Sequence, residues 1–289
     1  MIEILEVLPT IYFWLYVGLG VAFLAQGIWP ARGALRIAVV VLFAAGLGTH
    51  LAHFVTRWII NGHCPLQSKH EVYTATGLTT MVFALALYIS ERVWRNRGAA
   101  AVLGSFVFVL LTAFGGIMWT KLGMNEDYRV NNLVPALQSG WHPPHVSAYM
   151  LGYGSLGLAA ILALAYTIGT LGQRFFGADS GFRHLASPLV DRWTYKIAGL
   201  GFPFMTAALC MGALWADSSW GEYWFWDAKE TWALISWAFF LIYFHTRFIK
   251  GFAGVKAQAL VVGGGLMILI TYLAMHVLPA SQASLHVYN

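Results

Sequence analysis

Apolar residues run along this chain in blocks of about 20, and short stretches between the blocks hold most of the charged residues. Roughly 20 apolar residues in a helix cross the hydrocarbon core of a bilayer, so each block predicts a membrane-spanning helix. The predicted spans are residues 11–29, 35–60, 72–91, 99–119, 146–171, 197–215, 231–249 and 259–278. We therefore expect an all-α, polytopic membrane bundle of about eight transmembrane helices, with residues 1–289 forming a single integral membrane domain.

The composition supports a protein embedded in the lipid bilayer. Hydrophobic residues make up 59% of the chain and charged residues 10%, whereas about a quarter of the residues in soluble domains are charged. The chain has no basic run or basic helix face, which argues against nucleic acid as a partner. Its first residues lack the basic region of a cleaved signal peptide, so we expect the first apolar block to remain in the membrane.

The placement of the basic residues predicts which loops face the cytoplasm. Twelve of the 17 Lys and Arg residues lie in alternate loops, and the remaining five lie on the opposite side. Under the positive-inside rule the first set of loops is cytoplasmic. Both termini and the loop between the sixth and seventh spans then face outward. This arrangement predicts a multi-pass membrane protein, which we expect in a bacterial inner membrane with its functional face toward the periplasm.

Tryptophan is concentrated between residues 215 and 237, where six of the chain's 13 Trp residues lie. Trp and Tyr also collect at membrane–water interfaces, which is the simpler interpretation. Here, however, Trp220, Trp224 and Trp226 are interleaved with Gly221 and the acidic Asp227. This alternation favours a flat apolar platform with polar groups at its edge, which suits a large planar ligand.

Several motifs in this chain resemble one family. Residues 220–232 read W-G-x-x-W-x-W-D-x-K-E-T-W and resemble the WWD signature of the haem-handling superfamily that includes the CcsA/ResC, CcmC and CcmF proteins. Further segments resemble the CcsA/ResC branch in particular: the R-W and G-H-x-P loop at 57–65, L-V-P-A-L-Q-S at 133–139 with H-V-S at 145–147, F-H-T-R at 244–247 and S-L-H-x-Y at 284–288. The resemblance extends over nearly the whole chain.

This resemblance implies a role in cytochrome c biogenesis. In such systems haem b crosses the membrane, is held reduced at the outer face, and is joined by thioether bonds to a C-x-x-C-H apocytochrome c. The implied enzyme is a holocytochrome c synthase, or cytochrome c haem lyase, assembled with a CcsB/ResB partner. The chain would position the haem, because the vinyl groups and thiols carry the reaction, and no catalytic residue is assigned.

Two alternatives remain open on the sequence. A CcmC-like protein would deliver haem to a haem chaperone, and a haem b electron-transfer subunit would use intramembrane histidines for a permanently bound haem. Cys64 and Cys210 form neither a C-x-x-C-H haem attachment motif nor a zinc motif, so the chain is not itself a c-type cytochrome.

The resemblance also implies site residues at the outer face. The two axial ligands of the haem iron would be His145 and His286, within an outer site built from residues 141–145, 215–237 and 280–289. Neutral imidazole is a common axial ligand. The haem platform would comprise Trp220, Gly221, Trp224, Trp226, Asp227 and Trp232. We expect the anionic Asp227 and Glu230 to cap the following helix rather than to contact the haem propionates, for which Lys229 is the nearest cation.

Other histidines are weaker candidates. His245 matches the family's transmembrane ligand position. It lies 18 residues beyond Asp227, about 27 Å along a helix, so it implies a second, deeper haem site. His50 and His53 share one helix face and could bind a metal or a haem edge, or form a hydrogen-bonded polar pair. His142 competes locally with His145. His63 and His276 are further haem-related candidates, and the roles of Cys64 and His70 stay open.

Overall fold

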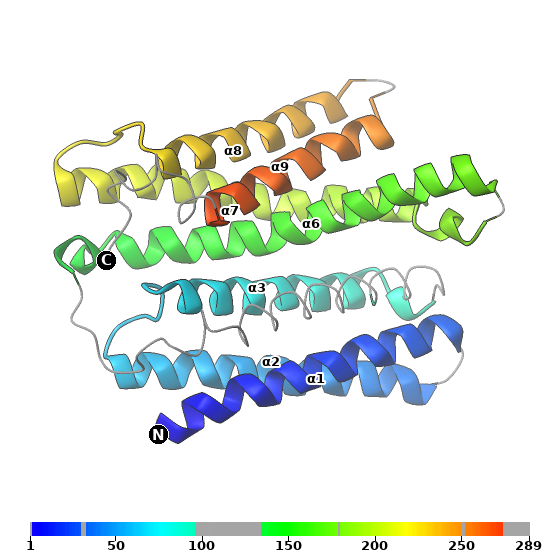
Figure 1. Ribbon diagram of the computed structural model, residues 1–289, viewed down its shortest axis with the longest axis horizontal. Coiled ribbons are helices and arrows are strands. Elements are labelled where there is room, and N and C mark those ends of the chain that lie inside the picture. Colours follow the sequence, from blue (N-terminus) through cyan, green and yellow to red (C-terminus); the bar gives the residue numbers. More distant parts are fainter. Residues whose placement is uncertain are drawn as a thin grey trace. The chain divides into compact units, whose positions relative to one another are not determined.

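A computed structural model describes residues 2–29, 33–95, 104, 134–178, 180–249 and 252–273. Within these residues it contains seven α-helices and three short 3-10 helices, and no strand, so the all-α prediction is confirmed (Figure 1). The predicted span at 99–119 lies outside the described residues apart from residue 104, and so do His276 and His286.

Six of the described helices are long and apolar enough to cross a membrane. They contain the predicted spans at 11–29, 35–60, 72–91, 146–171, 197–215 and 259–278, apart from residues at the ends of these ranges. The helix at the seventh predicted span falls outside this set, because Lys229, Glu230, Arg247 and several Trp, Ser and Thr residues lower its apolar character. The total of about eight spans and the outward termini stay predictions.

The chain divides into two compact units, Met1–Asn132 and Leu133–Asn289. The first contains α1 (Ile2–Ile28), α2 (Gly33–Asn61), α3 (Lys69–Ser90) and η1 (Val93–Arg95), and α2 packs against both α1 and α3. At one end of this unit Phe23 makes edge-to-face contacts with Phe43 and Tyr88, which form a buried aromatic core. The other end of the unit holds buried histidines and an ion pair.

The second unit contains η2 (Pro135–Gln138), α6 (His142–Phe176), η3 (Gly181–His184), α7 (Pro188–Trp220), α8 (Ala228–Arg247) and α9 (Val255–Leu273). The long helices α6 and α7 pack along each other, and α9 packs on both α6 and α8. Side chains join these helices as well: Ser155 donates a hydrogen bond to the Ile197 carbonyl at 2.6 Å, and the Trp237 indole donates to Thr206 at 2.9 Å. This packing places the end of α7 beside the start of α6.

Several helices are longer than the predicted spans, and α7 shows why. The apolar block predicted residues 197–215, whereas the helix runs from Pro188 to Trp220. The Ser187 side chain accepts a hydrogen bond from the Val190 backbone at its start, and Gly221 ends it with a positive φ of 83°. Backbone hydrogen bonding continues until a cap stops it, so helix length follows the caps rather than the apolar stretch.

Candidate functional site

The centre of the Trp-rich segment is a short loop held between two helix caps. Gly221 caps the end of α7 in the left-handed conformation, and its N–H donates to the Asp217 carbonyl at 2.9 Å. Only glycine adopts this conformation at no steric cost, which explains the Gly of the W-G pair. Asp227 then caps the start of α8. The loop is therefore confined to residues 222–226, where the chain turns from one helix into the next.

Asp227 and Glu230 form a reciprocal capping box. The Asp227 carboxylate accepts from the Glu230 N–H at 2.8 Å, and Glu230 Oε2 accepts from the N–H groups of Asp227 at 3.4 Å and Phe225 at 2.9 Å. The prediction that these two acids cap the helix is confirmed. Both carboxylates thereby hold the backbone of the Trp-rich loop.

The aromatic rings of this loop meet edge to face. Trp224 and Trp226 are inclined at 80° with centroids 5.8 Å apart, and Trp220 stands at 88° to Phe225. Edge-to-face pairs place the positive ring edge against the negative ring face, so they are favoured over a face-to-face sandwich. The structure thus differs from the flat platform that the alternation predicted. Trp226 has φ +57° and is 70% exposed, so its ring is presented to the surroundings.

His145 lies in the second turn of α6 and is held by α7. Its Nδ1 lies 2.8 Å from the carbonyl oxygen of Ala208. A carbonyl can only accept, so Nδ1 carries the proton and the lone pair lies on Nε2. The ring also stacks on Trp215 at 5.4 Å and 28°, and meets Tyr149 edge to face. This is the tautomer that binds a metal through Nε2, with its other N–H anchored on a carbonyl.

Trp215 organises the surroundings of His145. Its indole donates to the Ala136 carbonyl at 2.8 Å, which ties η2 to the end of α7. Its ring contacts the rings of His142, His145 and Trp220. The sequence marked Trp215 only as the first Trp of a cluster. No local pattern pairs Trp215 with Ala136, because the two residues lie 79 positions apart in the chain.

The remaining predicted residues of the outer site are placed less specifically. His142 is buried against Trp215, whereas Trp232 is half-buried in the first turns of α8 and Lys229 is exposed. The indole Nε1 of Trp224 is buried and makes no hydrogen bond within the described residues. Imidazole, an exposed Trp ring and an indole N–H donor are the kinds of group that bind a large aromatic ligand with a metal centre and polar edge groups.

His245 is exposed in the last turn of α8. Because α8 is continuous from Ala228 to Arg247, His245 and Asp227 lie about 27 Å apart along the helix, as the sequence predicted, and the second haem site stays a prediction. Arg247 of the same motif forms a two-pronged ion pair with Asp191 at 2.9 and 3.1 Å, and Gln258 also donates to Asp191. The arginine therefore joins α8 to α7 and α9.

The first unit buries the histidines at 50, 53 and 70 among tyrosines. His50 stacks on Tyr12 at 4.2 Å, and its Nδ1 lies 3.1 Å from the Tyr16 hydroxyl. His53 meets His70 edge to face at 5.9 Å, and neither nitrogen of His53 makes a hydrogen bond within the described residues. No group of three or more His, Cys, Asp or Glu in the described residues could hold a metal ion. The hydrogen-bonded alternative thus holds for His50 but not for His53.

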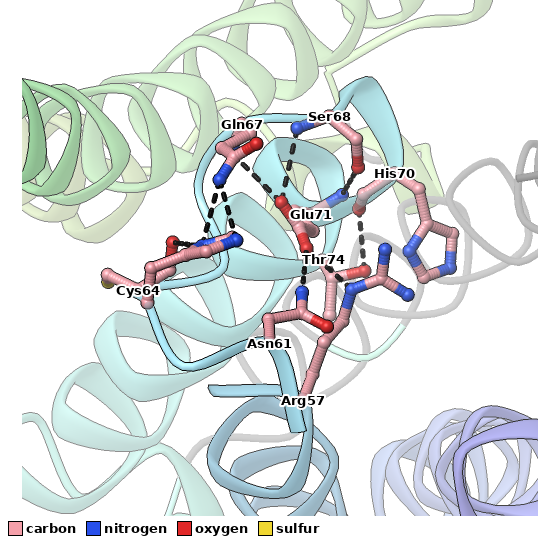
Figure 2. Close-up of polar contacts among 9 residues, drawn as sticks. Arg57, Asn61, Cys64, Gln67, Ser68, His70, Glu71 and Thr74 are labelled. Carbon is pink, nitrogen blue, oxygen red and sulfur yellow. Dashed lines mark hydrogen bonds and ion pairs between the residues drawn. The ribbon is translucent and has the colours of Figure 1, made fainter. Parts of the chain in front are cut away.

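A buried ion pair organises the loop between α2 and α3 (Figure 2). Arg57 and Glu71, both under 8% exposed, meet at 2.6 Å. Glu71 also accepts from the Asn61 amide and from the N–H groups of Gln67 and Ser68, and it forms a capping box with Ser68. These contacts account for the R-W and G-H-x-P loop as an anchored turn.

His63 and Cys64 lie in the same turn. His63 Nδ1 lies 3.2 Å from the Cys64 carbonyl, and Gln67 covers its ring. The Cys64 thiol is half-buried, and burial, assisted by the negative charge of Glu71, raises its pKa to about 11.

Comparisons with known proteins match this chain over most of its length. The family model described as cytochrome C assembly protein matches residues 69–281. Proteins named cytochrome c biogenesis protein CcsA are similar to the chain. The one from Gossypium hirsutum is 32% identical, over 78% of this chain and 78% of the relative. The one from Chlamydomonas reinhardtii is 33% identical, over 81% of this chain and 64% of the relative. The one from Cyanophora paradoxa is 30% identical, over 94% of this chain and 94% of the relative.

Proposed function

Because the chain belongs to the cytochrome c assembly protein family, we propose that its second unit holds haem b at the outer face of the membrane with His145 as one axial ligand. The role of the family is cytochrome c maturation, in which haem is the substrate. His286 is the second proposed ligand and lies outside the described residues. Trp220, Trp224, Trp226 and Trp232 are the proposed contacts to the ring.

The hydrogen bond between His145 Nδ1 and the Ala208 carbonyl carries this proposal. It keeps the ring proton on Nδ1, leaves the lone pair on Nε2 as the proposed iron-binding atom, and raises the basicity of that nitrogen. Two neutral imidazoles in axial positions favour a low-spin iron. The protein then contributes position and exclusion of competing ligands, while the thiols of the apocytochrome supply the reacting groups.

Attachment requires only that the two reactants are held together. Each thioether bond joins a cysteine sulfur of the C-x-x-C-H motif to one carbon of a haem vinyl group, and the thiol proton passes to the other vinyl carbon. No external oxidant is consumed. Effective molarity supplies the rate when the vinyl group and the thiol are held in contact. The chain would thus act as the haem-presenting subunit of a holocytochrome c synthase in a bacterial inner membrane.

The exposure of His245 supports a partner subunit. This side chain lies on the surface of the second unit near the inner end of α8. An intramembrane histidine that faces outward is costly unless it meets a partner or a ligand. We propose that a CcsB/ResB-type subunit supplies the ligand opposite His245, at a transmembrane haem site separate from the outer one.

The test is a visible absorption spectrum of the purified complex of the chain with its partner, under reduction. We expect wild type to show low-spin ferrous haem, and His145→Ala and His286→Ala to lose that spectrum or to let the iron oxidise. His184→Ala, an exposed histidine in η3, serves as the control and should match wild type. Unchanged spectra in both ligand variants would refute the outer site.

A further inference from the structure

One face of α7 restrains the His145 ring at three points. Gly212 and Trp215 lie four and seven positions after Ala208, so the three residues share a helix face. The Ala208 carbonyl accepts from Nδ1 at 2.8 Å, and the Trp215 ring stacks against the imidazole. Gly212 lies between them, under the ring. The position and the tautomer of His145 therefore depend on how closely the imidazole approaches this stretch of α7.

Gly212 is the point of closest approach. A Cβ atom built on Gly212 would lie 2.5 Å from Cε1 and 2.9 Å from Nδ1 of His145. Carbon atoms in contact are about 3.5–4.0 Å apart, so any side chain here would push the ring back by roughly 1 Å. A hydrogen bond stretched by that amount is lost. The absence of a side chain at 212 is thus what allows His145 to reach the Ala208 carbonyl.

We propose that Gly212 is a positioning residue for the iron ligand: it lets His145 bond the Ala208 carbonyl and so directs Nε2 toward the haem iron. This inference rests on the proposed function, because it concerns the ligand assigned there. Gly212 itself does not touch the haem. It acts through His145, as groups around metal ligands do when they set the tautomer and orientation of an imidazole.

A simpler role for Gly212 would be to let α6 and α7 pack closely, with no effect on the ligand. Gly199 distinguishes the two roles because it lies in the same helix, where an added Cβ would have Phe244 as its nearest neighbour, at 4.0 Å, among the described residues. Gly→Ala gives the same gain in helix propensity at both positions. Any difference between the two variants therefore reports the contact with His145.

The experiment compares Gly212→Ala, Gly199→Ala and His145→Ala in the full-length chain, co-purified with its partner subunit and its haem. The readout is the fraction of bound haem that is low-spin in the reduced spectrum, so a lower protein yield does not imitate the effect. We expect Gly212→Ala to lower this low-spin fraction roughly 10–100-fold, the loss typical when the groups that orient a metal ligand are changed. Gly199→Ala should match wild type.

A second experiment replaces the covalently attached His145 ring with free imidazole. In a His145→Gly background, added imidazole should restore the low-spin spectrum, because the free ligand can retreat by the distance that a tethered ring cannot. Gly212→Ala should then have no further effect. An equal loss in both backgrounds, or a Gly212→Ala spectrum that equals Gly199→Ala, would overturn the positioning role. Retention of the spectrum in His145→Ala would instead refute the ligand assignment itself, so the two failures are distinguishable.

Discussion

Asp227 and Glu230 bond each other's backbone N–H groups at the first turn of α8, at 2.8 and 3.4 Å. Because both carboxylates are used in this way, the acid of the WWD signature stabilises the shape of the loop. The conformation of the loop in turn sets the positions of the Trp224 and Trp226 rings, which precede this acid. The signature combines a rigid cap with exposed aromatic rings, and the two parts can be separated by mutation.

Substitution of Asp227 separates its cap from its charge. Asparagine caps a helix about as well as aspartate, so Asp227→Asn should change the free energy of unfolding by a few tenths of a kcal/mol. Asp227→Ala should cost about 1 kcal/mol and lower the haem content of the complex. Thermal unfolding and the haem absorption per chain measure both effects. If Asp227→Asn lost as much haem as Asp227→Ala, the negative charge rather than the cap would be the required feature.

The ion pair between Arg247 and Asp191 should behave as one structural unit. Removing either partner leaves a half-buried charge without its oppositely charged partner, so we expect each Ala variant to lose about 1–3 kcal/mol of stability. The double variant should lose little more than one single variant. Arg247→Lys keeps the charge but not the two-pronged geometry, and should fall between wild type and Arg247→Ala. Additive losses in thermal unfolding would contradict the coupling.

The Arg57–Glu71 pair is more deeply buried than the Arg247–Asp191 pair and should contribute more to the stability of the protein. Arg57→Ala leaves the Glu71 carboxylate buried without its charge partner, which should cost about 4 kcal/mol of stability. Glu71→Gln keeps an oxygen that can accept from the loop, so its loss should be smaller. Limited proteolysis of the loop at 62–68 measures the effect. Arg95→Ala, at an exposed position, is the control and should leave the cleavage rate unchanged.

Cys64 should react slowly with alkylating reagents at neutral pH. Its thiol pKa is raised to about 11 by burial and by Glu71, so at pH 8 roughly 0.1% is thiolate, which is the nucleophile. In a Cys210→Ser variant, where Cys64 is the remaining cysteine, the iodoacetamide rate should rise about tenfold per pH unit from pH 8 to 10. A rate that levels off near pH 9 would show an ordinary thiol.

Features that depend on neighbours along the chain could be predicted from the sequence. The apolar blocks located the helices, and the acids at 227 and 230 were recognised as a cap because a capping box involves residues three apart. Helix ends were predicted less well. Ser187 and Gly221 extend α7 by several residues at each side beyond the apolar block, since caps are polar or small and do not contribute to hydropathy.

Other relationships depend on side chains brought together by packing. The arrangement of the Trp rings differs from the predicted flat platform, because Trp226 takes a left-handed backbone conformation, φ +57°, that the W-x-W pattern does not specify. The role of Trp215 was likewise missed, since its indole bonds a carbonyl 79 positions earlier in the chain. Nothing in the sequence alone connects these two positions.

By itself, the sequence determined that this protein is helical and membrane-embedded, and which family its motifs resemble. These properties follow from local composition, periodicity and motif spacing. The tertiary structure decided where the proton of His145 lies, because that depends on a carbonyl 63 positions away. It also decided that Arg247 pairs with Asp191, 56 positions away. Hydrogen bonds of this kind form only when whole helix faces meet, so the chemistry of a side chain is specified by packing and not by its own segment.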